Sequence, residues 1–389
     1  MKAQLLRHSQ TVIPETIILG IESSCDETAA ALVRSDRKIL SHQIASSADI
    51  HASFGGVVPE IAARQHLDII DRVIAAAFKE AGMSFGDIDG VAATGGPGLI
   101  GGVLVGTMAA KAIAHARALP FFAVNHLEGH ALTARLTDGL TFPYLLLLVS
   151  GGHTQLLAVY GAGSYKRLGT TMDDAAGEAF DKGAAVLGLG YPGGPAIQRA
   201  ASSGDPKAIA LPRPRKGADD CHFSFSGLKT ALAQKWQKAA DKGDTSRADF
   251  AASLQTAIAD CLIDRTRHAM YIFAQEIDSG EIDNGEIDNG EIDNAEIDSN
   301  QTGRYQLVIA GGVAANIEIG SRLKHLAQEM SFDLFIPPAA LCTDNAAMIA
   351  WTGHEYMALG KASELDFAPR PRWPLDADAP PPPGRGVRA

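Results

Sequence analysis

The 389-residue sequence has few cysteines and no long apolar run. The cysteines are scattered and show no C-x-x-C spacing: Cys25, Cys221, Cys261 and Cys342. This pattern argues against a disulfide framework or a structural zinc ribbon, and it favours a reducing, cytoplasmic environment. Apolar runs such as 145–149 are far shorter than the roughly 20 residues that a membrane-spanning helix needs. Residues 1–15 also lack the apolar stretch of a secretion signal, and we expect them to form a disordered extension.

Net charge is nearly absent outside one segment, although the whole chain carries −11. Residues 276–300 contain five copies of a pentapeptide that begins Glu-Ile-Asp, and these copies hold ten of the net negative charges. Charge therefore neither excludes nor indicates binding to a nucleic acid. One isoleucine in five residues cannot cover a core, so we predict a disordered acidic insertion at 276–300. The alternative, a calcium loop, needs carboxylates at alternate positions and a final glutamate between two helices.

The sequence is rich in alternating strand-like and helix-like segments. Apolar runs predict strands near 16–21, 28–33, 90–93, 144–149, 155–160 and 305–310, and helical spacing predicts helices near 59–77, 99–118 and 251–273. Residues 223–229 alternate like a strand that enters a turn. The whole pattern is typical of an α/β protein with mixed sheets.

Two pairs of segments repeat each other faintly. The segments from Ile17 and from Leu145 both predict strand, small polar turn and strand, and those from Val91 and from Leu307 both predict strand, glycine pair and helix. This order suggests a duplicated two-lobe architecture with a cleft between the lobes. The alternative is chance, because any α/β protein contains such pairs.

A histidine pair is the first candidate for chemistry. His126 and His130 are four residues apart, so on a helix they face the same way and can share one metal ion. A zinc protease of the H-E-x-x-H type needs glutamate directly after the first histidine, where this chain has Leu127. The pair therefore indicates a metal without the protease, or an ordinary helix surface.

The best third ligand is Asp344, in a short polar turn before an apolar helix. Thr343 or Asp344 can equally be the N-cap of that helix, and the residues alone favour capping.

Three glycine-rich turns lie beside predicted strands: 95–98, 150–154 and 311–312. Bare backbone N–H groups in such turns can bind phosphate, particularly before a helix N-terminus. None has the Walker or dinucleotide spacing, and glycine is common in turns. Together they favour a nucleotide-like ligand.

Read in order, these segments resemble the tRNA N6-adenosine threonylcarbamoyltransferase family, formerly described as O-sialoglycoprotein endopeptidases. The matching stretches run from about Thr16 to Leu375 and include GIESSCDET, GGPGLIGGVLVG, NHLEGH, LLVSGGHTQL, DDAAGEAFDK, GLGYPGGP, FSFSGLKT, AGGVAAN, CTDNAAMIA and RPRWPL. The acidic repeats are not part of the family pattern. The resemblance implies a fold like that of actin, Hsp70 and sugar kinases. We expect lobe I at 16–140, completed by 340–368, lobe II at 141–339, and a Pro/Arg-rich tail at 369–389.

The resemblance also implies the site residues and the reaction. One metal, Fe²⁺ or Zn²⁺, is expected on His126, His130 and Asp344. The threonylcarbamoyl-AMP substrate is expected to contact the following residues: Leu148, Val149, Ser150, Gly151, Gly152, Asp181, Gly194 and Asn316. Glu22 is a candidate for a polar role near the acyl group, and Gln198 stands where many relatives have an acidic residue.

The implied reaction is acyl transfer to adenosine 37 of tRNA, with release of AMP. The implied protein partners are a paralogous, degenerate TsaB-like subunit and a TsaE-like ATPase. Three other readings remain: a small-molecule kinase of the same fold, an ATP-binding chaperone and a zinc protease. A kinase or a chaperone would not need the histidine pair, so metal analysis separates them from the transferase.

Overall fold

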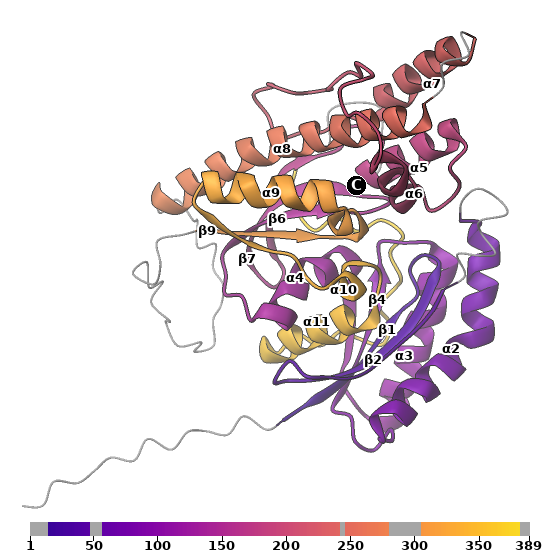
Figure 1. The fold of residues 1–389 in the computed structure, drawn as a ribbon. Helices are drawn as coiled ribbons and strands as arrows, with labels where there is room; N and C mark the ends of the chain where they lie inside the picture. The colour runs from indigo at the N-terminus through magenta and orange to yellow at the C-terminus, as the bar shows by residue number, and fades with distance from the viewer. Residues whose placement is uncertain (1–14, 47–56, 242–245, 280–304, 382–389) are drawn as a thin grey trace, which may run out of the picture.

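Two five-stranded sheets with the same strand order form the framework of the protein (Figure 1). The computed structural model describes residues 15–46, 57–241, 246–279 and 305–381. In the first sheet the order is β3-β2-β1-β4-β5. In the second, read from the corresponding edge, it is β8-β7-β6-β9-β10. We call the part built on the first sheet lobe I and the part built on the second sheet lobe II.

The strands of lobe I are β1 (Ile17–Glu22), β2 (Glu27–Arg34), β3 (Ile39–Ser46), β4 (Gly90–Gly96) and β5 (Phe121–Asn125). Strands β1, β2 and β3 pair antiparallel, whereas β4 and β5 continue the sheet in parallel with β1. The helices α2 (Pro59–Ala81) and α3 (Ile100–Arg117) pack on the outer face of this sheet, because β1 and β4 send leucine, isoleucine and valine to that side.

The strands of lobe II are β6 (Tyr144–Val149), β7 (Thr154–Gly161), β8 (Ser164–Thr170), β9 (Tyr305–Ala310) and β10 (Phe332–Phe335). They again form an antiparallel trio, extended by two parallel strands. Because position and direction of every strand match those of lobe I, the predicted duplication is confirmed. The predicted strands and helices also lie where the sequence pattern placed them, apart from one segment described below.

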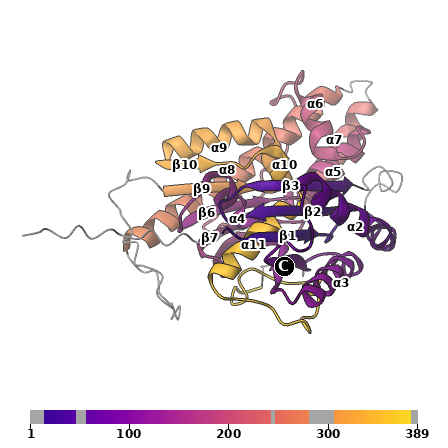
Figure 2. The ribbon, with the colours of Figure 1, turned by 90° about the horizontal axis from the view of Figure 1, so that it is seen from below.

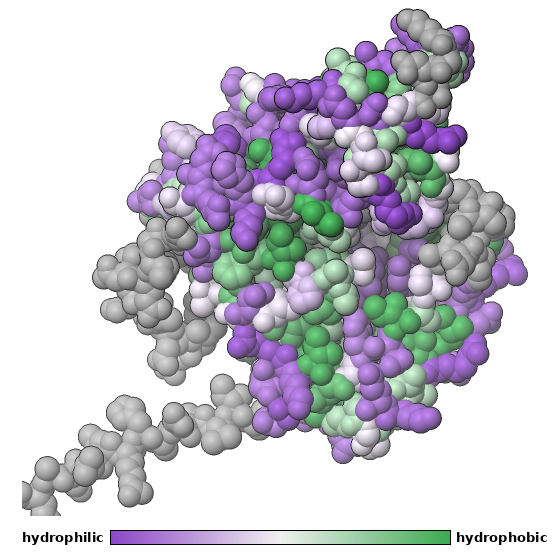
Figure 3. Space-filling model, viewed as in Figure 1, coloured by the Kyte–Doolittle hydropathy of each residue, from purple (hydrophilic) through white to green (hydrophobic). Residues whose placement is uncertain are grey.

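The outer layer of lobe II is made of helices. Its elements are α5 (Ala176–Leu187), α6 (Gly193–Ala201), α7 (Ser226–Ala240), α8 (Arg247–Ser279), the 3₁₀ turn η1 (Gly312–Ala315) and α9 (Ile317–Glu329). A short helix, α10 (Ala339–Cys342), leads back to lobe I. Figure 3 shows that hydrophilic residues cover much of the surface over α8 and α9.

Two helices fill the space between the sheets, α4 (His126–Asp138) and α11 (Ala346–Ala358) (Figures 1 and 2). Strand β6 shows how the layers form: Leu145, Leu147 and Val149 point to the outer helices, and the alternate residues point to α4. Helix α11 packs on the inner face of the lobe I sheet. Residues near the end of the described chain thus complete lobe I. No helix among the described residues is long and apolar enough to cross a membrane.

The acidic repeat begins as regular structure. Residues 276–279 form the last turn of α8, so the disordered insertion predicted to start at 276 starts too early. Glu276 accepts hydrogen bonds from Tyr160 Oη and Lys166 Nζ, and Asp278 accepts one from Tyr305 Oη. These contacts give the first repeat tertiary partners that its composition does not reveal. Residues 280–300 lie outside the described residues, as do residues 1–14 of the predicted extension.

The segment 223–229 is not a strand. Phe223 forms a single bridge with Thr171, and helix α7 begins at Ser226. The carboxylate of Asp173 accepts hydrogen bonds from the backbone N–H groups of Phe225 and Ser226, which stabilises the start of the helix. A partner about fifty residues away decides this structure, and the local alternation is therefore misleading.

The proline- and arginine-rich tail packs against both lobes. In lobe I, the amide of Asn125 donates a hydrogen bond to Trp373 O at 2.9 Å. In lobe II, Leu375 packs on the inner core, and Asp376 accepts a hydrogen bond from the Arg167 backbone N–H. The tail therefore crosses from one lobe to the other.

Candidate active site

The histidine pair lies at the edge of the lobe I sheet, directly after strand β5. The strand ends at Asn125, and α4 starts with the next residue, so both histidines lie in the first turns of this helix. The side chain of Asn125 accepts a hydrogen bond from Leu127 N at 3.0 Å and caps the helix. Strands β1 and β4 end at the same edge, which is where ligands bind in parallel sheets.

His126, His130 and Asp344 converge on one point. The Nε2 atoms of the two histidines lie 3.3 and 3.1 Å from the same oxygen, Asp344 Oδ1. Their ligand atoms all fall within 4.8 Å of one another, and both imidazoles are buried. Two imidazole nitrogens and one carboxylate suit Zn²⁺ or Fe²⁺ and leave coordination positions open for a substrate. The three residues therefore fit a single metal ion.

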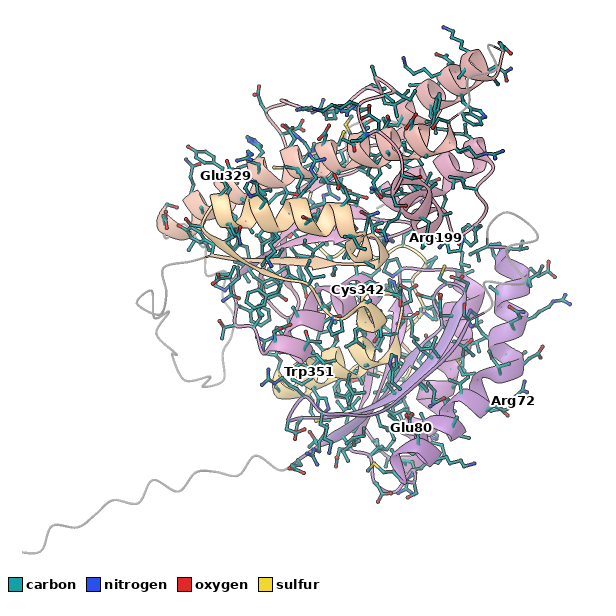
Figure 4. All side chains as sticks on the ribbon, in the orientation of Figure 1. Arg72, Glu80, Arg199, Glu329, Cys342 and Trp351 are labelled. Carbon is teal, nitrogen blue, oxygen red and sulfur yellow. The ribbon has the colours of Figure 1, made fainter. Side chains whose placement is uncertain are left out.

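Asp344 is free to face the histidines because its neighbour caps the helix. The N-cap of α11 is Asn345, whose side chain accepts a hydrogen bond from Met348 N at 2.9 Å. The capping role that the sequence favoured for Thr343 or Asp344 is therefore wrong. Figure 4 shows Cys342, two residues earlier, at the level where the lobes meet.

Glu22 lies behind His126 and not in the cleft. This last residue of β1 is fully buried, and its Oε2 is 3.0 Å from His126 Nδ1. It also accepts hydrogen bonds from Ser24 N and from Thr94 Oγ1. The predicted direct role near the acyl group does not agree with this position. A carboxylate on Nδ1 instead orients the ring so that Nε2 faces the metal position.

Charges dominate this cluster. Burial alone would lower the pKa of His126, but the carboxylates of Asp344 and Glu22 outweigh burial and raise that pKa well above its usual value. Burial would likewise raise the pKa of Asp344, and His126 and His130 hold it well below its usual range. Without a metal, the site therefore binds a proton where the metal would bind.

The glycine turn of lobe II is open. Leu148 and Val149 belong to β6 and have buried side chains, so the turn proper is Ser150 to His153. Its ends are joined by a hydrogen bond from Ser150 N to His153 O at 2.8 Å. A Cβ added at Gly151 or at Gly152 would meet no atom within 4 Å. The turn therefore exposes its backbone to a ligand.

His153 links this turn to the metal residues, and the sequence interpretation did not single it out. Burial lowers its pKa to about 4, and the charges of His126 and His130 add to that shift. The charges of the lobe I histidine pair therefore act on a neutral imidazole of lobe II. In the sequence, His153 was visible only as the end of a glycine turn. Nothing in that turn indicated an interaction with the histidine pair of lobe I.

The residues expected at the nucleoside lie on neighbouring elements. Asp181 on α5 accepts a hydrogen bond from Gly193 N at 2.7 Å, at the start of α6. On the same helix, Gln198 accepts one from Ile317 N at 2.8 Å, next to Asn316. A Cβ at Gly194 would meet no atom within 4 Å. Asn316, in contrast, is buried: its side chain accepts a hydrogen bond from Ile319 N and donates one to Gln255 Oε1 at 3.0 Å.

Tyr191 lies between the lobes and was also missed. Burial raises its pKa to about 12, with further contributions from Asp181 of lobe II and from Asp26 and Glu27 of lobe I. Acidic groups of both lobes therefore act on this phenol. In the sequence, Tyr191 appeared only within the matching stretch GLGYPGGP.

The other two glycine turns differ from each other. At 311–312, Gly311 has φ of 95°, and a Cβ would lie 2.4 Å from Val149 O, so this turn abuts the open one. The turn 95–98 is filled: Gly98 N donates to Pro371 O, Leu99 N donates to Ser24 O, and a Cβ at Gly96 would overlap Arg370 O. The expectation of an anion site at 95–98 is therefore wrong.

Comparison with known proteins identifies the family. The family model described as "TsaD: tRNA N6-adenosine threonylcarbamoyltransferase" matches residues 38–351. A protein named tRNA N6-adenosine threonylcarbamoyltransferase from Rhodospirillum rubrum is 54% identical over 378 residues, which cover 95% of this chain and 97% of that protein. A protein of the same name from Paramagnetospirillum magneticum is 54% identical over 366 residues, which cover 93% of this chain and 98% of that protein.

Among solved structures, T. kodakarensis HypF matches with a TM-score of 0.53 at 13% identity, over 88% of this chain and 48% of that chain. This likeness concerns the fold alone, and it agrees with the predicted fold of the actin, Hsp70 and sugar kinase type. The near-complete coverage of the relatives by sequence settles the family. The chain belongs to the tRNA N6-adenosine threonylcarbamoyltransferase family and is a transferase that modifies tRNA.

Proposed function

We propose that the protein transfers the threonylcarbamoyl group from threonylcarbamoyl-AMP to N6 of adenosine 37 in tRNAs that read codons beginning with A. One observation carries this proposal. The metal residues of lobe I and the open glycine turn of lobe II meet at the turn 311–312. A Cβ at Gly311 would lie 2.4 Å from Val149 O, where the open turn begins, and one at Gly312 would lie 3.9 Å from Thr343 Cγ2, next to Asp344. Such a site can hold an acyl-phosphate between a cation and backbone N–H groups.

The adenylate fits across the cleft in one orientation. Its nucleoside part is held by Asp181, Gly194 and Asn316, and its phosphate lies against the N–H groups of Gly151 and Gly152. The acyl group then points toward the three metal residues. Leu148 and Val149 support the turn from within β6, since their own side chains are buried.

His126, His130 and Asp344 hold the metal in this proposal, with Fe²⁺ or Zn²⁺ as the ion. When bound, the metal supplies Lewis-acid polarisation of the carbamoyl group or the phosphate. Glu22 keeps the His126 ring oriented through Nδ1. The glycine-turn amides stabilise negative charge that develops during the reaction.

The transfer itself forms one bond and breaks one. N6 of the adenosine attacks the carbamoyl carbon, the bond from that carbon to the phosphate oxygen breaks, and AMP leaves with the electron pair. The proton lost from N6 passes to solvent. Position 37 lies in a single-stranded loop, where a base can be turned out toward the cleft. Holding two large substrates in one orientation supplies much of the rate.

The partners and the location belong to the same proposal. The protein works in the cytoplasm with a paralogous, degenerate TsaB-like subunit and a TsaE-like ATPase. The family name supports tRNA as the substrate.

Transfer to unmodified tRNA is the decisive measurement. The purified chain is mixed with threonylcarbamoyl-AMP and tRNA, with and without the two candidate partners. We expect modified adenosine and AMP in equal amounts, and none with tRNA whose position 37 is guanosine. AMP release without modified tRNA under every combination of partners would contradict the proposal.

A further inference from the structure

One charged side chain between the two histidines in the sequence, that of Glu128, takes no part in the site described above. Glu128 lies two residues from each of His126 and His130, and at about 100° per residue it points to the opposite side of α4. It is nevertheless almost fully buried, with 3% of its surface exposed. A buried carboxylate is costly to maintain unless it is hydrogen-bonded.

Three donors from two directions surround this carboxylate. Gly163 N and Tyr165 Oη, from the β7–β8 hairpin of lobe II, donate to Oε1 at 2.7 and 2.9 Å. Tyr356 Oη, from α11, donates to Oε2. Glu128 thus connects α4 to lobe II through one oxygen and to α11 through the other.

The link to α11 bears directly on the metal residues. Helices α4 and α11 cross at Gly129, where a Cβ would lie 3.0 Å from Ile349 Cδ1 and 3.1 Å from Met348 Cγ. Along α11 this crossing lies between Asp344, just before the helix, and Tyr356 near its end. A contact at one end of a rigid helix, beyond a crossing point, restrains the position of the other end.

We propose that Glu128 is a positioning residue for the metal site. By holding Tyr356, next to the Arg135–Glu355 ion pair, it helps to fix the angle between α4 and α11 and so keeps Asp344 Oδ1 within 3.1–3.3 Å of both histidines. This inference rests on the proposed metal role of His126, His130 and Asp344. The contact to the β7–β8 hairpin anchors the carboxylate but does not set that distance.

Two tyrosine variants test this assignment as a matched pair. Tyr356→Phe and Tyr165→Phe each remove one hydroxyl that donates to the same carboxylate. Co²⁺ is titrated into the metal-free full-length chain, and its dissociation constant and visible absorption are recorded far below the melting temperature. Substitutions behind metal ligands weaken binding by about 10- to 100-fold. Tyr356 contacts Glu128 and not a metal ligand, so we expect Tyr356→Phe to bind Co²⁺ about fivefold more weakly, with an altered spectrum.

Tyr165→Phe is expected to lower the melting temperature by a similar amount but to change Co²⁺ affinity less than twofold. Unchanged affinity in Tyr356→Phe, or an equal loss in Tyr165→Phe, would overturn the inference. Glu128→Gln keeps one oxygen and the side-chain volume, so it should retain most of the affinity that Glu128→Leu loses. A wild-type chain that binds no Co²⁺ would instead overturn the metal site, and this inference with it.

Discussion

The two lobes share a strand order, yet the surroundings of their glycine turns differ. In lobe I, the turn at 95–98 is filled by the chain itself, with Arg370 O pressed against Gly96. In lobe II, Gly151 and Gly152 face open space. Lobe I contributes histidines and carboxylates, and lobe II contributes bare backbone. The duplicated framework thus carries candidate metal ligands in one lobe and an open backbone turn in the other.

The largest effect should come from removing a metal residue of lobe I. His126→Ala and Asp344→Ala each remove one of three ligands, so we expect loss of bound metal and a drop in transfer rate of at least about 100-fold. Both proteins should stay folded, because neither residue belongs to an apolar core cluster. Metal content by elemental analysis and circular dichroism check this. Full metal content in both variants would refute the ligand assignment.

Glycine substitutions should separate the two turns. Gly151→Val adds a side chain in open space, so we expect an unchanged melting temperature and about tenfold weaker AMP binding, because the phosphate loses its close approach. Gly96→Ala meets Arg370 O at a φ of 135°, so it should lower stability by about 2 kcal/mol or more. Calorimetry measures both quantities. Wild-type AMP affinity in Gly151→Val would argue against the open turn as the phosphate site.

The proton in lobe I should compete with the metal. Burial lowers the pKa of His126, but the carboxylates of Asp344 and Glu22 raise it by more. The protonated ring therefore persists to higher pH in the folded protein than in an unfolded chain. In the metal-free protein, this contribution to stability is complete below about pH 6.5 and disappears as pH rises through the raised pKa. Metal needs the neutral ring, so Co²⁺ affinity should rise with pH, by at most about tenfold per pH unit for this one proton.

Titrations at pH 6, 7 and 8 measure this dependence. Glu22→Gln removes one of the charges that favour the proton, and it should move the dependence to lower pH. Affinity that does not vary with pH would show that His126 is not a ligand.

The smallest effect is expected in the acidic repeat of lobe II. Excision of 281–300 with a short Gly-Ser bridge should leave the melting temperature and the transfer rate nearly unchanged, because loop closure changes by only about 0.6 kcal/mol per doubling of length. Excision from 276 should lower the melting temperature, because it removes the contacts of Glu276 to Tyr160 and Lys166. Differential scanning calorimetry compares the two. Equal stability would show that those contacts contribute nothing.

Local patterns were sufficient for the central strands, the longest helices and the histidine pair, but not for β3, β8 and β10 or for the start of α7. Residues at spacing four share a helix face wherever the helix lies, so His126 and His130 could be paired from sequence alone. Asp344 could only be suggested, because its distance from the histidines depends on how α11 packs against α4.

Contacts between distant segments were beyond these patterns. The filling of the 95–98 turn by residues near Arg370 and the approach of His153 to the histidines each join parts of the chain that no local rule connects. The same holds for Glu128, whose three donors come from a hairpin and a helix far along the chain. Periodicity shows which face a residue occupies but not what meets that face.

The separation of the metal residues along the chain sets an order during synthesis. Asp344 follows His130 by 214 residues, and α11, which covers the inner face of the lobe I sheet, comes later still. At about 5–20 residues per second, a ribosome needs about 10 to 40 s to make that stretch. Throughout this time the first sheet lacks one of its covering layers, and the two histidines lack their carboxylate. A metal ion held by all three residues, as proposed, therefore binds only after Asp344 has been synthesised.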